Sequence, residues 1–195
     1  RTVIDPAARG QGVFVILNQT IQAASEVTKT STQQLDTFQS PPFGPLGLID
    51  DDRVVFARRL THRTVYGPDP TFEPRVDLFT MYSGADSRFL DFARDQGTRG
   101  FVLGGTGRGN VPPAVVPGIQ RALDAGLPVA IATRCAHGRI LDTYAYPGSG
   151  HDLRQRGVLL AGTLPPAKAR IKLMLALGRS RDPREIRRLF EDGAY

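Results

Sequence analysis

The segment "EVTKTST" (26–32) places a lysine between two threonines in a strand-like pattern. The chain has 25 basic residues, and only three of them are lysines: Lys29, Lys168 and Lys172. Arginine stays protonated in proteins, whereas a lysine amine can lose its proton where its surroundings favour the neutral form. Lys29 is therefore a candidate for proton transfer or for activating a hydroxyl nucleophile. A strand lysine that reaches solvent is the competing interpretation.

A second candidate is the glycine-rich segment "LGGTGRGNV" (103–111), which follows an apolar strand and precedes a predicted helix. Backbone N–H groups in such a segment face the crevice at the carboxyl end of a parallel sheet, where a carboxylate or phosphate can bind. The spacing of Gly105, Gly107 and Gly109 departs from G-x-G-x-x-G, and Arg134 stands where a ribose-binding acid is expected. A dinucleotide site is therefore not predicted.

Composition narrows the classes of protein. The 195 residues are 41% hydrophobic and 23% charged, which is typical of a globular domain. No apolar run approaches the roughly 20 residues of a membrane span, so no membrane partner is expected. The single cysteine, Cys135, cannot form an internal disulfide, and we expect it to be buried in a protein of a reducing, cytoplasmic compartment. The cysteine and the three histidines lack ligand spacing, so neither a metal nor a cofactor is predicted.

The net charge of +6 raises nucleic acid and anionic substrates as partners. The arginines are scattered, except for the cluster in "GRSRDPREIRRLF" (178–190). Acidic residues lie at i,i+3 and i,i+4 spacing within that cluster, which is typical of an exposed, ion-paired helix. Nucleic acid is therefore not the expected partner.

The part of the chain after "GPDPTFEPR" (67–75), which the prolines mark as a linker, alternates between strands and helices. Near-continuous apolar strands in such an alternation predict an α/β fold, with a parallel sheet covered by helices on both faces. The expected strands are 76–82, 100–105, 127–135 and 158–162, and the expected helices are 86–97, 112–126, 151–157, 165–178 and 182–193.

The part before the linker is strand-rich. Segments 12–18 and 26–32 are predicted to be strands, and "LGLIDDDRVVFARR" (46–59) is predicted to form a hairpin turning at Asp50 to Asp52. No long helix is predicted here to cover strands as apolar as "VFVIL". This part is therefore expected to be the tail of a larger α/β domain, or to pack on a second copy of the chain.

Four motifs in order resemble the bacterial-type L-asparaginases: "EVTKTST", "LDTFQSPPFGPLG" (35–47), "GGTGRGNV" (104–111) and "AGTLPPAKARIKLMLAL" (161–177). The resemblance covers nearly the whole chain and matches the last part of such an enzyme. It implies that residues 1–66 end an incomplete N-terminal domain, that 67–75 form a linker, and that 76–195 form the C-terminal domain.

The resemblance also implies a function: hydrolysis of L-asparagine to L-aspartate and ammonia by a threonine nucleophile and a threonine–aspartate pair, both upstream of Arg1. This chain alone would then be inactive. Lys29 corresponds to the family lysine that works with that pair in proton transfer. Asn110 corresponds to an asparagine that reaches a neighbouring subunit's active site and helps to hold the substrate, which implies a homo-oligomer, a dimer or tetramer. The alternative role for Asn110 is to cap the following helix.

The family's second residue that acts across the interface, an acid in many members, falls in "GRILDTYAYPGSGHDL" (138–153), which is longer here. Asp142, Tyr144 and Tyr146 are the candidates, and Tyr144 fits best. This departure leaves the choice between asparagine and glutamine open. Two rival functions also stay open: the asparaginase-like subunit of a tRNA-dependent amidotransferase, and an amino-acid-binding α/β protein without catalysis.

Overall fold

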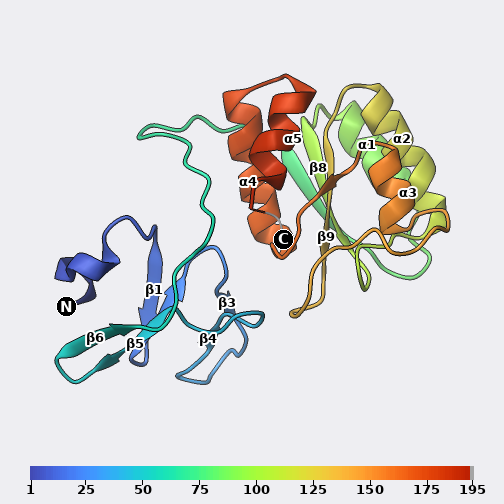
Figure 1. The fold of residues 1–195 in the computed structure, drawn as a ribbon. Coiled ribbons are helices and arrows are strands. Elements are labelled where there is room, and N and C mark those ends of the chain that lie inside the picture. The colour runs from blue at the N-terminus through green and yellow to red at the C-terminus, as the bar shows by residue number, and fades with distance from the viewer. Residues whose placement is uncertain (194–195) are drawn as a thin grey trace. The chain divides into compact units, whose positions relative to one another are not determined.

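The computed structural model describes residues 1–193 and divides the chain into two compact units, Arg1–Arg63 and Thr64–Tyr195. Each unit has its own buried core (Figure 1). The stretch 67–75, expected as a linker, belongs to the second unit.

The first unit opens with two short 3-10 turns and contains an antiparallel sheet. The turns are η1 (Thr2–Ile4) and η2 (Pro6–Ala8); the sheet has the order β1-β2-β5-β6, with β1 at Phe14–Leu17, β2 at Thr20–Ala23, β5 at Gly47–Asp50 and β6 at Arg53–Phe56. The β5–β6 hairpin turns where the sequence predicted it, with Asp50 opposite Arg53. Strand β2 was not predicted; it pairs with β1 across a turn in which Asn18 and Gln19 take positive φ.

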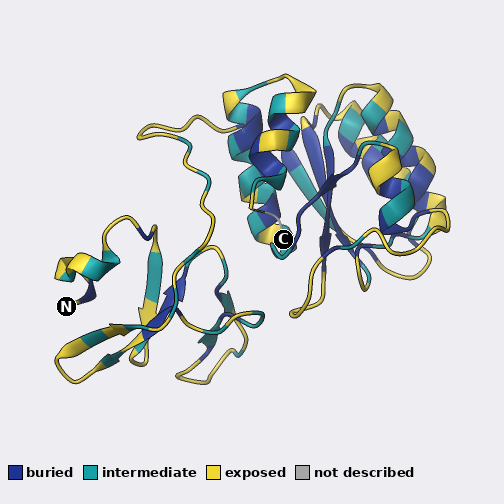
Figure 2. Ribbon diagram, viewed as in Figure 1, coloured by how far each residue is buried: buried dark blue, intermediate teal, exposed yellow. Residues whose placement is uncertain are grey.

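The expected strand 26–32 is short in the structure. Strand β3 (Thr28–Lys29) pairs only with β4 (Phe38–Gln39), a strand that the sequence did not predict. The core of this unit is small, with Ile21, Ala23 and Leu46 at its centre. Large apolar side chains of the antiparallel sheet remain 40–47% exposed: Ile16, Leu17, Leu48 and Val55. Figure 2 shows this unit as mostly intermediate and exposed.

The second unit is built on a four-stranded, all-parallel sheet of order β10-β9-β8-β7. Its strands are β7 (Val76–Thr80), β8 (Gly100–Gly105), β9 (Val129–Thr133) and β10 (Leu159–Leu160). Every residue of β8 and β9 is buried, as expected for strands covered on both faces (Figure 2). The α/β class and the parallel sheet predicted from the sequence are confirmed.

Helices cover both faces of this sheet (Figure 1). One core contains Phe101, Leu103 and Ile131 with helices α1 (Arg88–Asp95), α2 (Val116–Asp124, preceded by η3, Pro113–Val115) and α3 (Gly150–Gln155). The other contains Val102 and Ala130 with α4 (Pro166–Arg179) and α5 (Pro183–Glu191). Alternate residues of one strand thus serve opposite cores.

Local signals fix the helix ends. Ser149 and Asp182 accept hydrogen bonds from first-turn amides of α3 and α5, which supplies partners for N–H groups that the helix leaves free. Gly97 follows α1 at φ +86°, the left-handed conformation in which glycine commonly ends a helix. Asp86, expected as a cap of α1, accepts from the Arg88 amide from one residue further upstream than the usual cap position.

Candidate functional site

Lys29 lies on the two-residue ladder of β3 and β4, opposite Phe38, and it is exposed. The backbone beside it is held firmly. The Thr30 amide and hydroxyl both donate to the Thr37 carbonyl, at 2.8 and 3.0 Å. Thr37 is buried, and the hydroxyls of Ser31 and Thr37 bond the backbone of the connecting loop. The threonines and serine around Lys29 therefore fix the backbone and leave its amine to reach outward.

The end of this ladder is tied to the unit's sheet by a buried polar contact. The Ser40 hydroxyl, which follows β4, donates to Gln22 Oε1 on β2 at 2.7 Å, and both side chains are at most 2% exposed. A buried amide oxygen without a donor costs about 1–3 kcal/mol, so this pair favours one register of β4 against the sheet. The sequence contains one signal for this contact, a glutamine beside Ile21 in an otherwise apolar strand, which the sequence prediction missed.

The glycine-rich segment forms a closed turn at the carboxyl end of β8. Thr106 and Asn110 exchange backbone hydrogen bonds of 2.9 Å in both directions, and the Gly109 amide also donates to the Thr106 carbonyl. A side chain on Gly105 would meet the Asn110 carbonyl oxygen at 2.9 Å, and Gly107 and Gly109 take positive φ. The turn therefore requires its glycines at these positions.

The side-chain amide of Asn110 is the unusual group of this turn. Its Oδ1 atom is buried and has no hydrogen-bond partner, and its Nδ2 atom has only a long contact of 3.5 Å to the Thr106 carbonyl. Asn110 does not cap a helix, because η3 begins at Pro113 after Pro112 and no side chain bonds its first turn. The alternative role in helix capping was therefore wrong, and the amide retains an unsatisfied acceptor.

Tyr144 is 47% exposed and lies beside Tyr146, with ring centroids 6.0 Å apart. Backbone bonds hold its segment against the glycine-rich turn, from the Leu141 amide to the Arg108 carbonyl and from the Val111 amide to the Gly148 carbonyl. The structure therefore brings together the segments that carry Asn110 and Tyr144. Asp142, the acidic candidate, forms an exposed ion pair of 3.5 Å with Arg154.

Cys135 and Lys29 complete the set of predicted residues. Cys135 is exposed rather than buried, so the expectation that it packs as a small hydrophobe was wrong; it lies two residues beyond β9, where the chain has left the core. Lys29 belongs to the first unit, whereas Asn110 and Tyr144 belong to the second. Within residues 1–193, no group of three or more histidine, cysteine or acidic side chains is placed to hold a metal ion.

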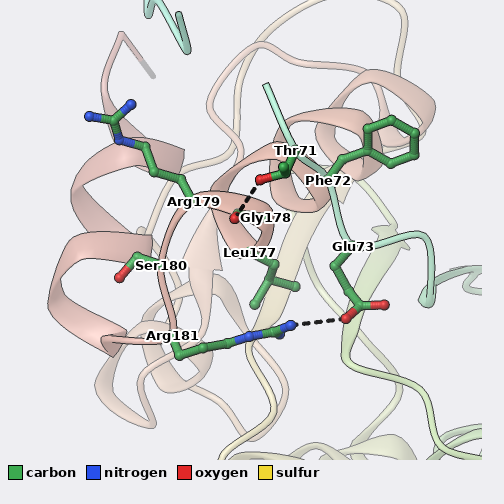
Figure 3. Close-up of a pocket in the computed structure, with 8 residues that line it drawn as sticks. All are labelled: Thr71, Phe72, Glu73, Leu177, Gly178, Arg179, Ser180 and Arg181. Atoms are coloured by element: carbon green, nitrogen blue, oxygen red, sulfur yellow. Dashed lines mark hydrogen bonds and ion pairs between the residues drawn. The ribbon is translucent and has the colours of Figure 1, made fainter. Parts of the chain in front are cut away.

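A cleft in the second unit lies between residues 71–73 and the end of α4 (Figure 3). Glu73 is buried here and accepts from Arg181 at 3.0 Å and Arg75 at 3.2 Å. Hydrogen bonds from Arg181 and then from Arg75 lower the pKa of the Glu73 carboxyl to about 2. The Thr71 hydroxyl donates to the Gly178 carbonyl at 2.8 Å. These contacts hold residues 71–73 on the second unit and occupy the polar groups of the cleft with structural bonds.

Comparison with known proteins identifies the class. Residues 75–190 match the glutaminase/asparaginase C-terminal domain, and residues 1–62 match the N-terminal asparaginase domain. The chain therefore belongs to the asparaginase family, which confirms the resemblance seen in the four motifs.

Several relatives share about a third of their aligned residues with this chain. It is 36% identical to an L-asparaginase of Bacillus licheniformis, covering 90% of this chain and 54% of that protein. It is 33% identical to a "probable L-asparaginase periplasmic" of Haemophilus influenzae, covering 96% and 54%. It is 34% identical to one of the subunits of glutamyl-tRNA(Gln) amidotransferase from Pyrococcus horikoshii, covering 85% and 38%. The chain thus spans about half the length of the asparaginases it matches.

No helix within residues 1–193 is both long enough and apolar enough to cross a membrane.

Proposed function

We propose that this chain is the C-terminal portion of an amidohydrolase that converts L-asparagine to L-aspartate and ammonia. Family membership supports the class of reaction. The observation that carries the substrate-binding part of the proposal is the buried, unpartnered Oδ1 of Asn110. A buried acceptor costs about 1–3 kcal/mol until a donor reaches it. The α-ammonium group of an amino-acid substrate is such a donor, as is an N–H group of a neighbouring subunit.

In this proposal the nucleophile is a threonine upstream of Arg1. Its hydroxyl attacks the side-chain amide carbon after losing a proton, the nitrogen leaves as ammonia after gaining one, and water then hydrolyses the resulting ester. Lys29 transfers the proton through a threonine–aspartate pair, also upstream. Only a neutral lysine can accept that proton, and Lys29 lies in a rigid ladder that can present its amine to such a pair.

Asn110 and Tyr144 contribute substrate contacts across a subunit interface, so the active protein is a homo-oligomer, a dimer or tetramer. Their adjacent segments form one surface on the second unit. L-glutamine is the second substrate to test, because Tyr144 stands where many family members have an acid. The protein needs no cofactor or metal in this scheme, and its proposed location is the cytoplasm.

The deciding experiment measures ammonia release from asparagine and glutamine by the full-length gene product. Lys29→Met should lower kcat by about 10²–10⁴-fold, the usual contribution of a positioned acid or base. Lys168→Met is the matched control, because it removes a lysine from α4 instead and should leave the rate near the wild-type value. Normal deamidation by the Lys29 variant would refute the proposed role of this lysine.

The first alternative is a subunit of a tRNA-dependent amidotransferase. It is favoured by the similarity to the amidotransferase protein of Pyrococcus horikoshii and by the net charge of +6. Such a subunit should release little ammonia from free asparagine until a partner protein and charged tRNA are added.

The second alternative, a protein that binds amino acids without catalysis, should show calorimetric binding of aspartate or asparagine with no ammonia released at any protein concentration. The two measurements, made on the same preparation, separate this alternative and the amidotransferase subunit from the proposed asparaginase.

A further inference from the structure

Thr133, the last residue of β9, connects the sheet to the glycine-rich turn. Its side chain is 4% exposed, although it ends a strand next to solvent-exposed residues. Its hydroxyl donates to the Gly107 carbonyl at 2.5 Å and accepts from the Cys135 amide at 3.0 Å. The parallel register sets Thr133 opposite Gly105, directly before the turn. One hydroxyl thus bonds both the turn and the chain that leaves the sheet.

The contact falls where the turn has least other support. Gly107 and Arg108 are exposed at its tip, and the remaining backbone bonds of the turn join Thr106 to Gly109 and Asn110. Gly107 also lies beneath the Asn110 amide, because a side chain added to Gly107 would come within 3.7 Å of Asn110 Nδ2. A shift of the Gly107 peptide therefore displaces the surface on which the Asn110 amide rests.

Apolar contacts hold the other side of the turn. A side chain on Gly109 would meet Ile140 at 2.7 Å and Ile131 at 3.4 Å, and both isoleucines are buried. The Ile140 backbone is itself fixed, since its amide donates to the Gly162 carbonyl at 3.0 Å. With Gly109 already in contact on this side, the Thr133 hydroxyl is the polar contact that sets the position of the tip.

We infer that Thr133 is a positioning residue: its hydroxyl holds the 106–110 turn in the one conformation that presents the Asn110 amide to substrate. The inference rests on the proposed function for its kinetic consequence, but not for the structural contact. Thr133 touches no reacting atom in this scheme and acts through Asn110.

The test compares Thr133→Val, Thr133→Ser and Thr98→Val in the full-length gene product. Valine keeps the shape of threonine and removes the hydroxyl, whereas serine keeps the hydroxyl. Thr98 is the matched control: it is a buried threonine whose hydroxyl donates to the Arg75 and Gly100 carbonyls, at the opposite edge of the same sheet.

Thr133→Val should raise KM for asparagine by about tenfold, the equivalent of one hydrogen bond, while kcat changes less. Thr133→Ser should restore KM to within about threefold of wild type. Thr98→Val should lower the melting temperature without changing KM. A KM rise of equal size in the Thr98 and Thr133 valine variants, or a folded serine variant that fails to restore KM, would overturn the inference.

Hydrogen exchange tests the contact independently of catalysis. The Gly109 and Asn110 amides should exchange about tenfold faster in Thr133→Val than in wild type or Thr133→Ser. If the wild-type protein released no ammonia, the proposed function would fail, and the exchange rates would still decide the role of Thr133. Unchanged exchange would reject it. Thr133→Ala, which removes the hydroxyl without adding volume, replaces the valine variant if that variant does not fold.

Discussion

Replacing Glu73 with glutamine tests how the second unit holds residues 71–73. Glu73 is 7% exposed, and its usual pKa of 4.5 falls to about 2 because Arg181, then Arg75, bonds its charged form. At about 1.4 kcal/mol per tenfold change in proton affinity, the shift corresponds to about 3 kcal/mol. The two arginine side chains are 64% and 55% exposed, so solvent screening reduces the contribution to about 1–2 kcal/mol.

The pH dependence has a definite sign. The folded pKa lies below the unfolded value, so the stabilisation is present above about pH 4.5 and is lost as the pH falls toward about 2. Glu73→Gln should therefore unfold with about 1–2 kcal/mol less free energy than wild type near neutral pH, and the difference should shrink toward zero in acid.

Urea unfolding followed by far-UV circular dichroism suits this measurement, because every α-helix described in residues 1–193 belongs to the second unit. Glu185→Gln is the control: it breaks an exposed pair with Arg188 on α5 and should change the unfolding midpoint much less. The reasoning is refuted if Glu73→Gln unfolds at the wild-type midpoint near neutral pH, or if its deficit persists unchanged in acid.

Two further changes probe the same unit. Gly178→Ala should destabilise it by about 1–3 kcal/mol, because the new methyl would lie 2.2 Å from the Thr71 carbonyl oxygen; melting temperature reports the loss, and hydrogen exchange at 71–73 should rise with it. Burial, and then the charge of Asp192, raise the pKa of Tyr66 from 10 to about 12, so the folded state holds a proton that the unfolded state releases, and stability should fall between about pH 10 and 12. Tyr66→Phe should flatten that alkaline fall at the cost of its 3.3 Å bond to the Leu189 carbonyl, and melting curves that stay parallel across this range would contradict the assignment.

The second unit could be predicted from the sequence because each of its elements carries a local signal. Its strands are short apolar runs, and glycines such as Gly97 and Gly126 end helices at positive φ. The first unit lacked such signals at two strands. Strand β2 contains buried Gln22, whose partner Ser40 lies 18 residues away, and β4 is only two residues long. Contacts of that separation cannot be inferred from a local pattern.

The candidate site divides in the same way. Lys29 could be singled out from the chemistry of its side chain, and the glycine-rich turn from its position after a strand. The unpartnered Asn110 acceptor and the Thr133 hydroxyl bond depend on the register of β8 against β9, which brings residues 26 positions apart into contact. That register follows from packing on both faces of the sheet, which a sequence pattern does not specify.

The antiparallel sheet of the first unit has one further consequence. Strand β1, with the sequence Phe-Val-Ile-Leu, forms one outer edge of that sheet, whereas the hairpin that forms the other edge has three aspartates at its tip. Free backbone donors and acceptors along an uncharged, apolar edge provide a template for strand addition between molecules. Concentrated solutions of this polypeptide will therefore aggregate first through β1, and a lysine placed on that strand is the simplest way to keep the molecules apart.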